Sequence, residues 1–147
     1  MTEKVVTADR VVHAPPEAIF ELIADPARQP EWDGNDNLAE APAGQRVRAV
    51  GDVFTMTLIK SGATRNNRVV AFEEGSLIAW RPSEPGKREP GHEWRWELTP
   101  AEGGTRVVHT YDWTDLTDSN RIPRARNTTS ERLAASLDRL AALAEAR

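Results

Sequence analysis

The sequence predicts an α+β fold in which a curved antiparallel sheet of about six to seven strands wraps around one long C-terminal helix. Apolar and polar residues alternate in short segments between Gly44 and Trp113, as they do in half-buried strands. The C-terminal segment instead repeats leucines at helical spacing. A single helix does not fill the space inside a strongly curved sheet, so we expect a cavity between the two.

The N-terminal third predicts one strand and two short helices. Residues 5–13 are rich in β-branched side chains and predict the first strand. Pro15 and Pro16 suit the start of a helix, which Asp25-Pro26 ends. We expect a second, shorter helix through residues 26–32, with Trp32 closing it.

The central region predicts an antiparallel meander. Glycine, asparagine, serine or proline separates successive apolar segments, and such short connections are typical of hairpins. The predicted strands are residues 45–50, 51–60, 66–75, 76–82, 92–100 and 105–113.

The C-terminal helix is predicted from its cap and its apolar stripe. Thr128 and Glu131 have the spacing of a capping box. Pro123 indicates a possible earlier turn of helix, which leaves the start of the long helix open.

The hairpin between the last two strands determines which side chains share a face. A two-residue loop at Gly103-Gly104 would place Trp94 opposite Trp113, Trp96 opposite Tyr111 and Leu98 opposite His109. A three-residue loop would instead turn Val108, Thr110 and Asp112 inward. We prefer the even loop because it gathers the aromatic side chains on one apolar face.

Composition limits the class of protein. The chain has 147 residues, a net charge of −4 and no cysteine, so one domain over residues 1–147 is expected, without disulfides. No lysine or arginine run suggests nucleic-acid binding, and no apolar run is long enough for stable membrane insertion. We therefore expect a cytoplasmic monomer or homodimer.

Three segments carry a family resemblance: "VVHAPPEAIFELIADPARQPEW", "GGTRVVHTYDW" and "SERLAASLDRLAALAEA". Together they resemble the SRPBCC/START-like superfamily, and within it the polyketide cyclase/dehydrase and lipid-transport group. The resemblance implies a helix-grip fold with a deep apolar pocket for lipids, sterols, polyketides or similar molecules. It does not fix the activity, because members bind, catalyse or contact other proteins.

The inward positions of the predicted strands and helix supply the expected pocket lining. The alternative is that these side chains simply fill a core. The expected ligand-binding residues are Phe54, Met56, Phe72, Trp94, Trp96, Trp113, Leu133, Leu137 and Leu140.

Three polar residues are candidates for ligand chemistry. His109 and Tyr111 are the candidate catalytic pair for proton transfer, although a hydrogen-bonded structural histidine is the alternative. Arg81 would bind a ligand carboxylate if the preceding turn directs it, rather than Trp80, inward. His13, His92 and His109 lack the tight spacing of metal ligands, so no metal and no cofactor is expected.

Three functions fit these features. The preferred one is binding or transport of a hydrophobic small molecule, which needs only a suitable cavity. The second is a polyketide cyclase, aromatase or dehydratase that uses His109 and Tyr111. The third is a protein-interaction module of the chaperone-regulator kind. The loop of residues 83–91, rich in proline and glycine, is a candidate lid over the pocket.

Overall fold

A computed structural model describes residues 4–146 of the chain. Its sheet contains seven antiparallel strands in the order β1-β7-β6-β5-β4-β3-β2. The first and last of the long strands are therefore neighbours, and the rest form a meander. The strands are β1 (Val5–Val12), β2 (Leu38–Glu40), β3 (Val53–Leu58), β4 (Thr64–Glu73), β5 (Leu77–Ser83), β6 (Glu93–Ala101) and β7 (Gly104–Asp112).

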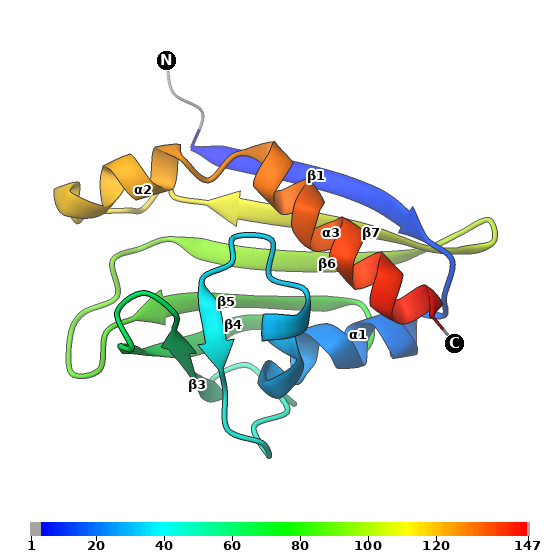
Figure 1. The fold of residues 1–147 in the computed structure, drawn as a ribbon, viewed down its shortest axis with the longest axis horizontal. Coiled ribbons are helices and arrows are strands. Elements are labelled where there is room, and N and C mark those ends of the chain that lie inside the picture. Colours follow the sequence, from blue (N-terminus) through cyan, green and yellow to red (C-terminus); the bar gives the residue numbers. More distant parts are fainter. Residues whose placement is uncertain (1–3, 147) are drawn as a thin grey trace.

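The helices lie on one face of this curved sheet, and α3 crosses in front of β1, β7 and β6 (Figure 1). This arrangement confirms the predicted sheet wrapped around a C-terminal helix. It also confirms the two short helices after the first strand. The helical elements are α1 (Pro16–Ala24), η1 (Pro26–Glu31), η2 (Ser119–Arg121), α2 (Ile122–Arg126) and α3 (Ser130–Glu145).

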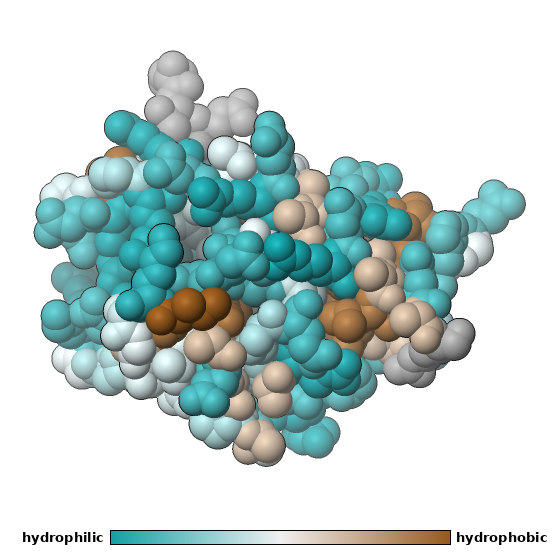
Figure 2. Space-filling model, in the orientation of Figure 1, coloured by the Kyte–Doolittle hydropathy of each residue, from teal (hydrophilic) through white to brown (hydrophobic). Residues whose placement is uncertain are grey.

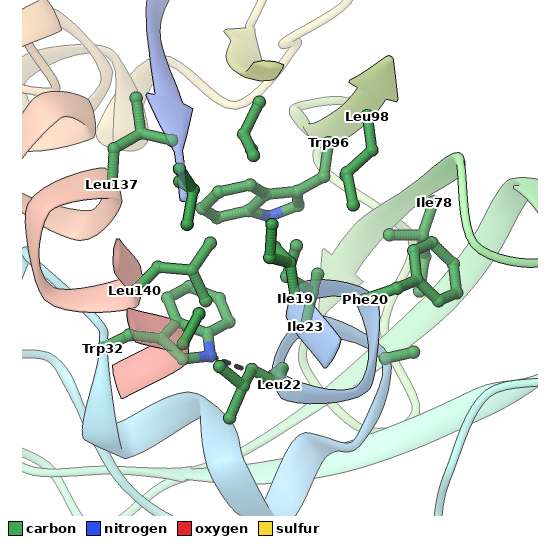
Figure 3. Packing of buried hydrophobic residues seen from close by; sticks show 14 of the residues in the cluster. Ile19, Phe20, Leu22, Ile23, Trp32, Ile78, Trp96, Leu98, Leu137 and Leu140 are labelled. Carbon is green, nitrogen blue, oxygen red and sulfur yellow. Dashed lines mark hydrogen bonds between the residues drawn. The ribbon is translucent and has the colours of Figure 1, made fainter. Parts of the chain in front are cut away.

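The core is concentrated at the end of the molecule where α1 and α3 meet the sheet. Trp96 is 0% exposed there and packs among apolar side chains of α1 and α3 (Figure 3). Trp32 packs edge-on against Trp96, with ring centroids 5.0 Å apart, and its indole N–H donates to the Leu22 carbonyl over 2.7 Å. Trp32 therefore closes this end of the molecule.

The β6–β7 hairpin has the predicted even loop but a different register. Ala101 pairs with Gly104, so the loop is Glu102-Gly103, and Trp94 faces Tyr111 while Trp96 faces His109. Every pairing is therefore displaced by two residues from the prediction, and the aromatic face is preserved. Gly103 has φ +77°, a backbone conformation that glycine adopts readily in turns. Gly104 lies directly against the Val12 carbonyl of β1.

The predicted strand at residues 45–50 is wrong. The Gln45 side chain accepts a hydrogen bond from the Thr55 backbone N–H over 2.8 Å and donates to the Thr55 carbonyl over 3.1 Å. The Asp52 carboxylate accepts hydrogen bonds from the backbone N–H groups of Arg48 and Ala49. A side chain thus occupies the edge of β3 locally, and Asp52 folds the preceding residues into a turn.

The start of α3 also differs from the prediction by one residue. Thr129, rather than Thr128, is the N-cap, because its hydroxyl accepts a hydrogen bond from the Arg132 N–H. Thr128 donates its hydroxyl to the Arg124 carbonyl of α2. The earlier turn of helix indicated by Pro123 is present as α2. Two adjacent threonines therefore join α2 to α3: Thr128 bonds to the end of α2, and Thr129 caps the start of α3.

Candidate ligand-binding cavity

A cavity of about 620 Å³ lies between the sheet and the elements that cross its concave face. Its volume is within the range of about 300–1,000 Å³ that is usual for small-molecule sites. The sheet contributes Met56, Trp80, Trp94, Trp96, His109 and Tyr111, and the opposite side includes Trp32, Thr128 and Ser136. The cavity therefore has an aromatic wall formed mainly by neighbouring strands.

Cross-strand pairing organises this aromatic wall. Trp94 and Tyr111 are partners in the β6–β7 ladder, and their ring centroids are 4.4 Å apart. Trp96 and His109 are the next inward pair, stacked with centroids 3.6 Å apart and an interplanar angle of 14°. Alternation along two adjacent strands thus produces a continuous surface of rings.

His109 is held as a neutral imidazole within this wall. It is 3% exposed, and its Nδ1 lies 3.1 Å from the Arg95 carbonyl, which fits an Nδ1–H donor. Burial lowers the pKa of His109 to about 3, although the hydrogen bond to Arg95 acts in the opposite direction. At neutral pH the ring is therefore uncharged and firmly positioned.

Tyr111 presents a neutral phenol to the cavity. Its side chain is 4% exposed, and burial raises its pKa to about 12, against the influence of Arg124 and Arg121. The hydroxyl consequently keeps its proton throughout the physiological range. It can donate a hydrogen bond to a ligand oxygen or accept one from a ligand hydroxyl.

His92 also lines the cavity, as its place in the alternation with Trp94 and Trp96 indicates. Its ring centroid is 6.0 Å from that of Tyr111, and its buried Nδ1 has no hydrogen-bond partner among the described residues. Burial lowers the pKa of His92 to about 4, with further contributions from Arg121 and Arg124. His92 lies two residues before Trp94, and the alternation along β6 therefore indicates that its side chain points inward.

Only part of the predicted lining reaches the cavity. Met56, Trp94 and Trp96 do, as do His109 and Tyr111. The other predicted side chains pack against neighbouring side chains instead of lining the cavity. Phe54 packs edge-on against Trp80 at 5.4 Å, and Phe72 against Phe20 at 5.7 Å.

Four more of the predicted lining residues are absent from the cavity wall because they, too, pack against neighbouring side chains within the protein. Leu137 and Leu140 are buried in the main core with Trp96, whereas Leu133 and Trp113 belong to a second buried cluster beside Tyr111. None of these four side chains forms part of the cavity wall. The helix stripe therefore stabilises the fold, and the side of α3 toward the cavity contributes polar residues such as Ser136 instead.

Of the two alternatives that the sequence left open for the start of β5, the structure has Trp80 inward and not Arg81, so Arg81 does not reach the cavity. The pairing of Glu73 with Leu77 directs Trp80 inward, where it is 6% exposed. Arg81 lies on the opposite face, with Nε 3.2 Å from Glu93 and Nη2 3.2 Å from Asp115. Arg81 therefore forms ion pairs with these two carboxylates outside the cavity.

The cavity rim carries more positive than negative side chains, which the strand pattern did not predict. Asp33 at the rim accepts hydrogen bonds from the backbone N–H groups of Asn35, Asn37 and Leu38, and Asp36 pairs with Arg139. Both carboxylates are thus engaged in local structure. The basic lining residues are Lys60, Arg65, Arg121, Arg124 and Arg132.

The histidines do not form a shared metal site. His13 lies near the Gly103 carbonyl beyond the end of β1, and His92 and His109 are in the cavity wall. Among residues 4–146, no group of three or more histidine or carboxylate side chains is arranged to hold a metal ion.

Comparison with known proteins places this fold in a class of single curved sheets closed by a C-terminal helix. The chain resembles protein CV1439 from Chromobacterium violaceum, with 19% identity, a TM-score of 0.69 and coverage of 97% of this chain and 99% of that one. It also resembles the Aha1 dimer from Colwellia psychrerythraea, with 18% identity, a TM-score of 0.67 and 96% coverage of both chains. At these identities the likeness concerns the fold.

Sequence comparison assigns the family. Residues 3–145 match the model of the polyketide cyclase/dehydrase and lipid transport family, and the chain belongs to this family. An uncharacterized protein of Mycobacterium tuberculosis, Rv0088, is 34% identical over 107 residues, which are 69% of this chain. The match spans 44% of the length of that relative. No described helix is both long and apolar enough to cross a bilayer.

Proposed function

We propose that this protein binds, and carries in its cavity, a hydrophobic small molecule of lipid, sterol or polyketide type. The observation that supports this most directly is the cavity of about 620 Å³ with its wall of Trp80, Trp94, Trp96 and Tyr111. Burial of ligand surface against such a wall contributes about 25 cal/mol per Å² of apolar area. Family membership supports the same class of ligand.

Binding agrees better than proton-transfer catalysis with the state of the polar groups. The low pKa of His109, about 3, leaves it a weak base at neutral pH, and its ring stacks with those of Trp94 and Trp96. Tyr111, with a pKa of about 12, serves as a hydrogen-bond donor. These properties favour His109 as a positioning residue of the aromatic wall over the alternative of a cyclase or dehydratase.

The interaction-module alternative receives less support from the surface. The face that carries α3 is mostly hydrophilic, and its apolar areas are small and separate (Figure 2). Large contiguous apolar patches are typical of protein contact sites. The cavity is therefore the better candidate for the functional surface.

Native mass spectrometry of the freshly purified protein, followed by organic extraction, tests the proposal first. We expect a retained hydrophobic species that is released by solvent. Methyl cis-parinarate, an uncharged fluorescent lipid ester, provides the second test, because its fluorescence rises when it enters an apolar site. A protein that retains nothing and does not bind this ester would contradict the proposal.

Trp94→Ala is the sharpest variant for locating the bound ester. Trp94 is only partly buried and lines the cavity, whereas Trp96 is fully buried in the core, so its replacement would disturb folding. We expect Trp94→Ala to weaken methyl cis-parinarate binding about tenfold, through loss of aromatic contact. Trp113→Phe is the matched control, since Trp113 packs beside Leu133 outside the cavity, and its affinity should stay within about twofold. Equal losses in both variants would place the ester elsewhere.

A further inference from the structure

Three arginines distant in sequence meet at one end of the cavity. Arg65 begins the inward-facing positions of β4, Arg121 ends η2, and Arg124 belongs to α2. All three also line a neighbouring cavity of about 550 Å³. Glu84, Lys87 and Glu89 of the loop between β5 and β6 form part of its other side. The arginines therefore lie where the aromatic cavity meets the second, more polar space.

Two of these guanidinium groups are largely removed from solvent. The side chains of Arg65 and Arg121 are 16% and 18% exposed. Arg121 Nε is buried without a hydrogen-bond partner among the described residues, although Asp118 Oδ2 is 3.4 Å away. Buried cations are costly unless they are paired and hydrogen-bonded. The Arg121 guanidinium donates to Glu84 through Nη2 over 3.2 Å, whereas its buried Nε is left without a hydrogen-bond partner among residues 4–146.

The neighbouring carboxylates do not balance the positive charge. Glu84 lies 3.7 Å from Arg65, 3.2 Å from Arg121 and 2.9 Å from Lys87. Asp118 is the second acidic partner of Arg121. Arg124 has no carboxylate oxygen within 4.0 Å among residues 4–146. Glu89, the third carboxylate around the second cavity, is paired with Arg68. Glu84 and Asp118 are therefore the carboxylates that remain for Arg65, Arg121, Arg124 and Lys87, and Arg88 adds a further positive charge to the lining.

The effect of this excess charge extends into the aromatic cavity. Burial lowers the pKa of Arg65, and repulsion from Arg121 and Arg124 lowers it further against the attraction of Glu84. The same arginines contribute to the low pKa of His92, which stands beside Tyr111 in the wall. Positive side chains thus gather at one end of a cavity that has an aromatic wall, and the positive potential they produce attracts an anion.

We infer that Arg65, Arg121 and Arg124 bind the carboxylate of an amphipathic acid whose apolar part lies against the tryptophan wall. Guanidinium groups bind carboxylates through paired, charge-assisted hydrogen bonds, which suits this position. The inference rests on the proposed binding function and specifies its ligand class as apolar molecules with an acidic head group. In this inference these three arginines, and not Arg81, bind the ligand carboxylate.

Two probes that differ only in charge test the inference: cis-parinarate and its methyl ester. The unmodified protein should bind the acid about tenfold or more tightly than the ester. Arg124→Gln is the decisive variant, because Arg124 has no ion pair among the described residues whose loss would disturb folding. This substitution should weaken acid binding about tenfold and leave ester binding within about twofold.

Arg106→Gln is the matched control. Arg106 of β7 is also an exposed arginine, but it pairs with Asp9 over 2.9 Å and lies outside both cavities. Acid affinity should therefore stay unchanged in this variant. A loss of acid affinity equal to that of Arg124→Gln would indicate a general surface effect and overturn the inference.

The remaining outcomes separate the inference from the function on which it rests. Equal affinity for acid and ester, unaffected by Arg124→Gln, would overturn the carboxylate site while supporting the apolar cavity. Failure of both probes to bind would contradict the apolar cavity and the carboxylate site together. Weaker acid binding at high salt, with ester binding unchanged, would support the inference, because salt screens the attraction between charges.

Discussion

At the scale of single residues, alternation predicted which aromatic side chains share a face but not which of them reach the cavity. Trp94, Trp96, His109 and Tyr111 all lie in the wall as their spacing indicates. Phe54 is on the same inward face, yet Trp80 covers it. Whether an inward side chain meets a ligand or a neighbour depends on contacts between distant segments, and periodicity carries no information about them.

The meeting of Arg65, Arg121 and Arg124 could be predicted only in part from the sequence. Counting back in twos from the buried Val69 places Asn67 and Arg65 on the inward face of β4, so two polar residues at inward positions were visible. Arg121 and Arg124 belong to a segment without regular spacing between β7 and α3. Their approach to Arg65 is determined by tertiary structure alone.

The neutral state of His109 makes a specific prediction about pH. The unfolded chain binds a proton at this residue below about pH 6.5, whereas the folded chain does so only near its lowered pKa of about 3. Stability due to this difference is complete above pH 6.5 and is lost as the pH falls toward 3. Between pH 7 and pH 5 the free energy of unfolding should fall by about 2 kcal/mol from His109 alone.

Urea unfolding at the two pH values measures this contribution. In His109→Gln the difference between the free energies at pH 7 and pH 5 should be smaller by about 2 kcal/mol, because the titrating group is gone. The variant's lower overall stability does not affect this comparison, which uses differences within each protein. An unchanged difference would show that His109 is protonated in the folded state at pH 5.

At the scale of elements, the type of each long element was predictable and several of its contacts were not. Strict alternation predicted β3 to β7, and the leucine spacing predicted α3. Residues 45–50 had the composition of a strand, but Gln45 and Asp52 provide their hydrogen bonds through side chains instead. The short strand β2 has only three residues, too few for a recognisable alternation.

The two glycines of the β6–β7 hairpin have different roles, which substitution to alanine should separate. A Cβ on Gly104 would lie 2.1 Å from the Val12 carbonyl oxygen, so Gly104→Ala must push β1 away from β7. We expect a loss of about 2–3 kcal/mol in the free energy of unfolding. Gly103→Ala, the adjacent control, meets nothing closer than 3.8 Å and should cost about 1 kcal/mol from its φ of +77°.

Urea unfolding compares the two variants, and amide hydrogen exchange along β1 shows where the damage lies. Faster exchange confined to β1 and β7 in Gly104→Ala would agree with a local separation of these strands. Equal costs for the two substitutions would mean that β1 moves aside without penalty, contrary to its full pairing with β7 from Val5 to Val12.

At the scale of the whole molecule, the fold divides into a filled and a hollow end. Trp32, Trp96 and the apolar side chains of α1 and α3 fill one end completely. Toward the other end, η2 and α2 cover the sheet with polar and basic residues, and the cavity remains beneath them. Stability and ligand binding thus depend largely on different parts of the same sheet, and Trp32, Trp80 and Trp96 belong to both.

This division predicts how a bound ligand changes the stability of the entire protein. A molecule that binds only the folded state raises the free energy of unfolding by about 2.7 kcal/mol at a free concentration of 100 times its Kd. For a domain of this size, that corresponds to a rise in Tm of roughly 5–10 °C. Calorimetry with methyl cis-parinarate should show this rise in the unmodified protein and a smaller one, at the same ester concentration, in Trp94→Ala. An equal rise in both proteins would place the stabilising ester outside the aromatic cavity, because removal of Trp94 weakens only ligands that contact it.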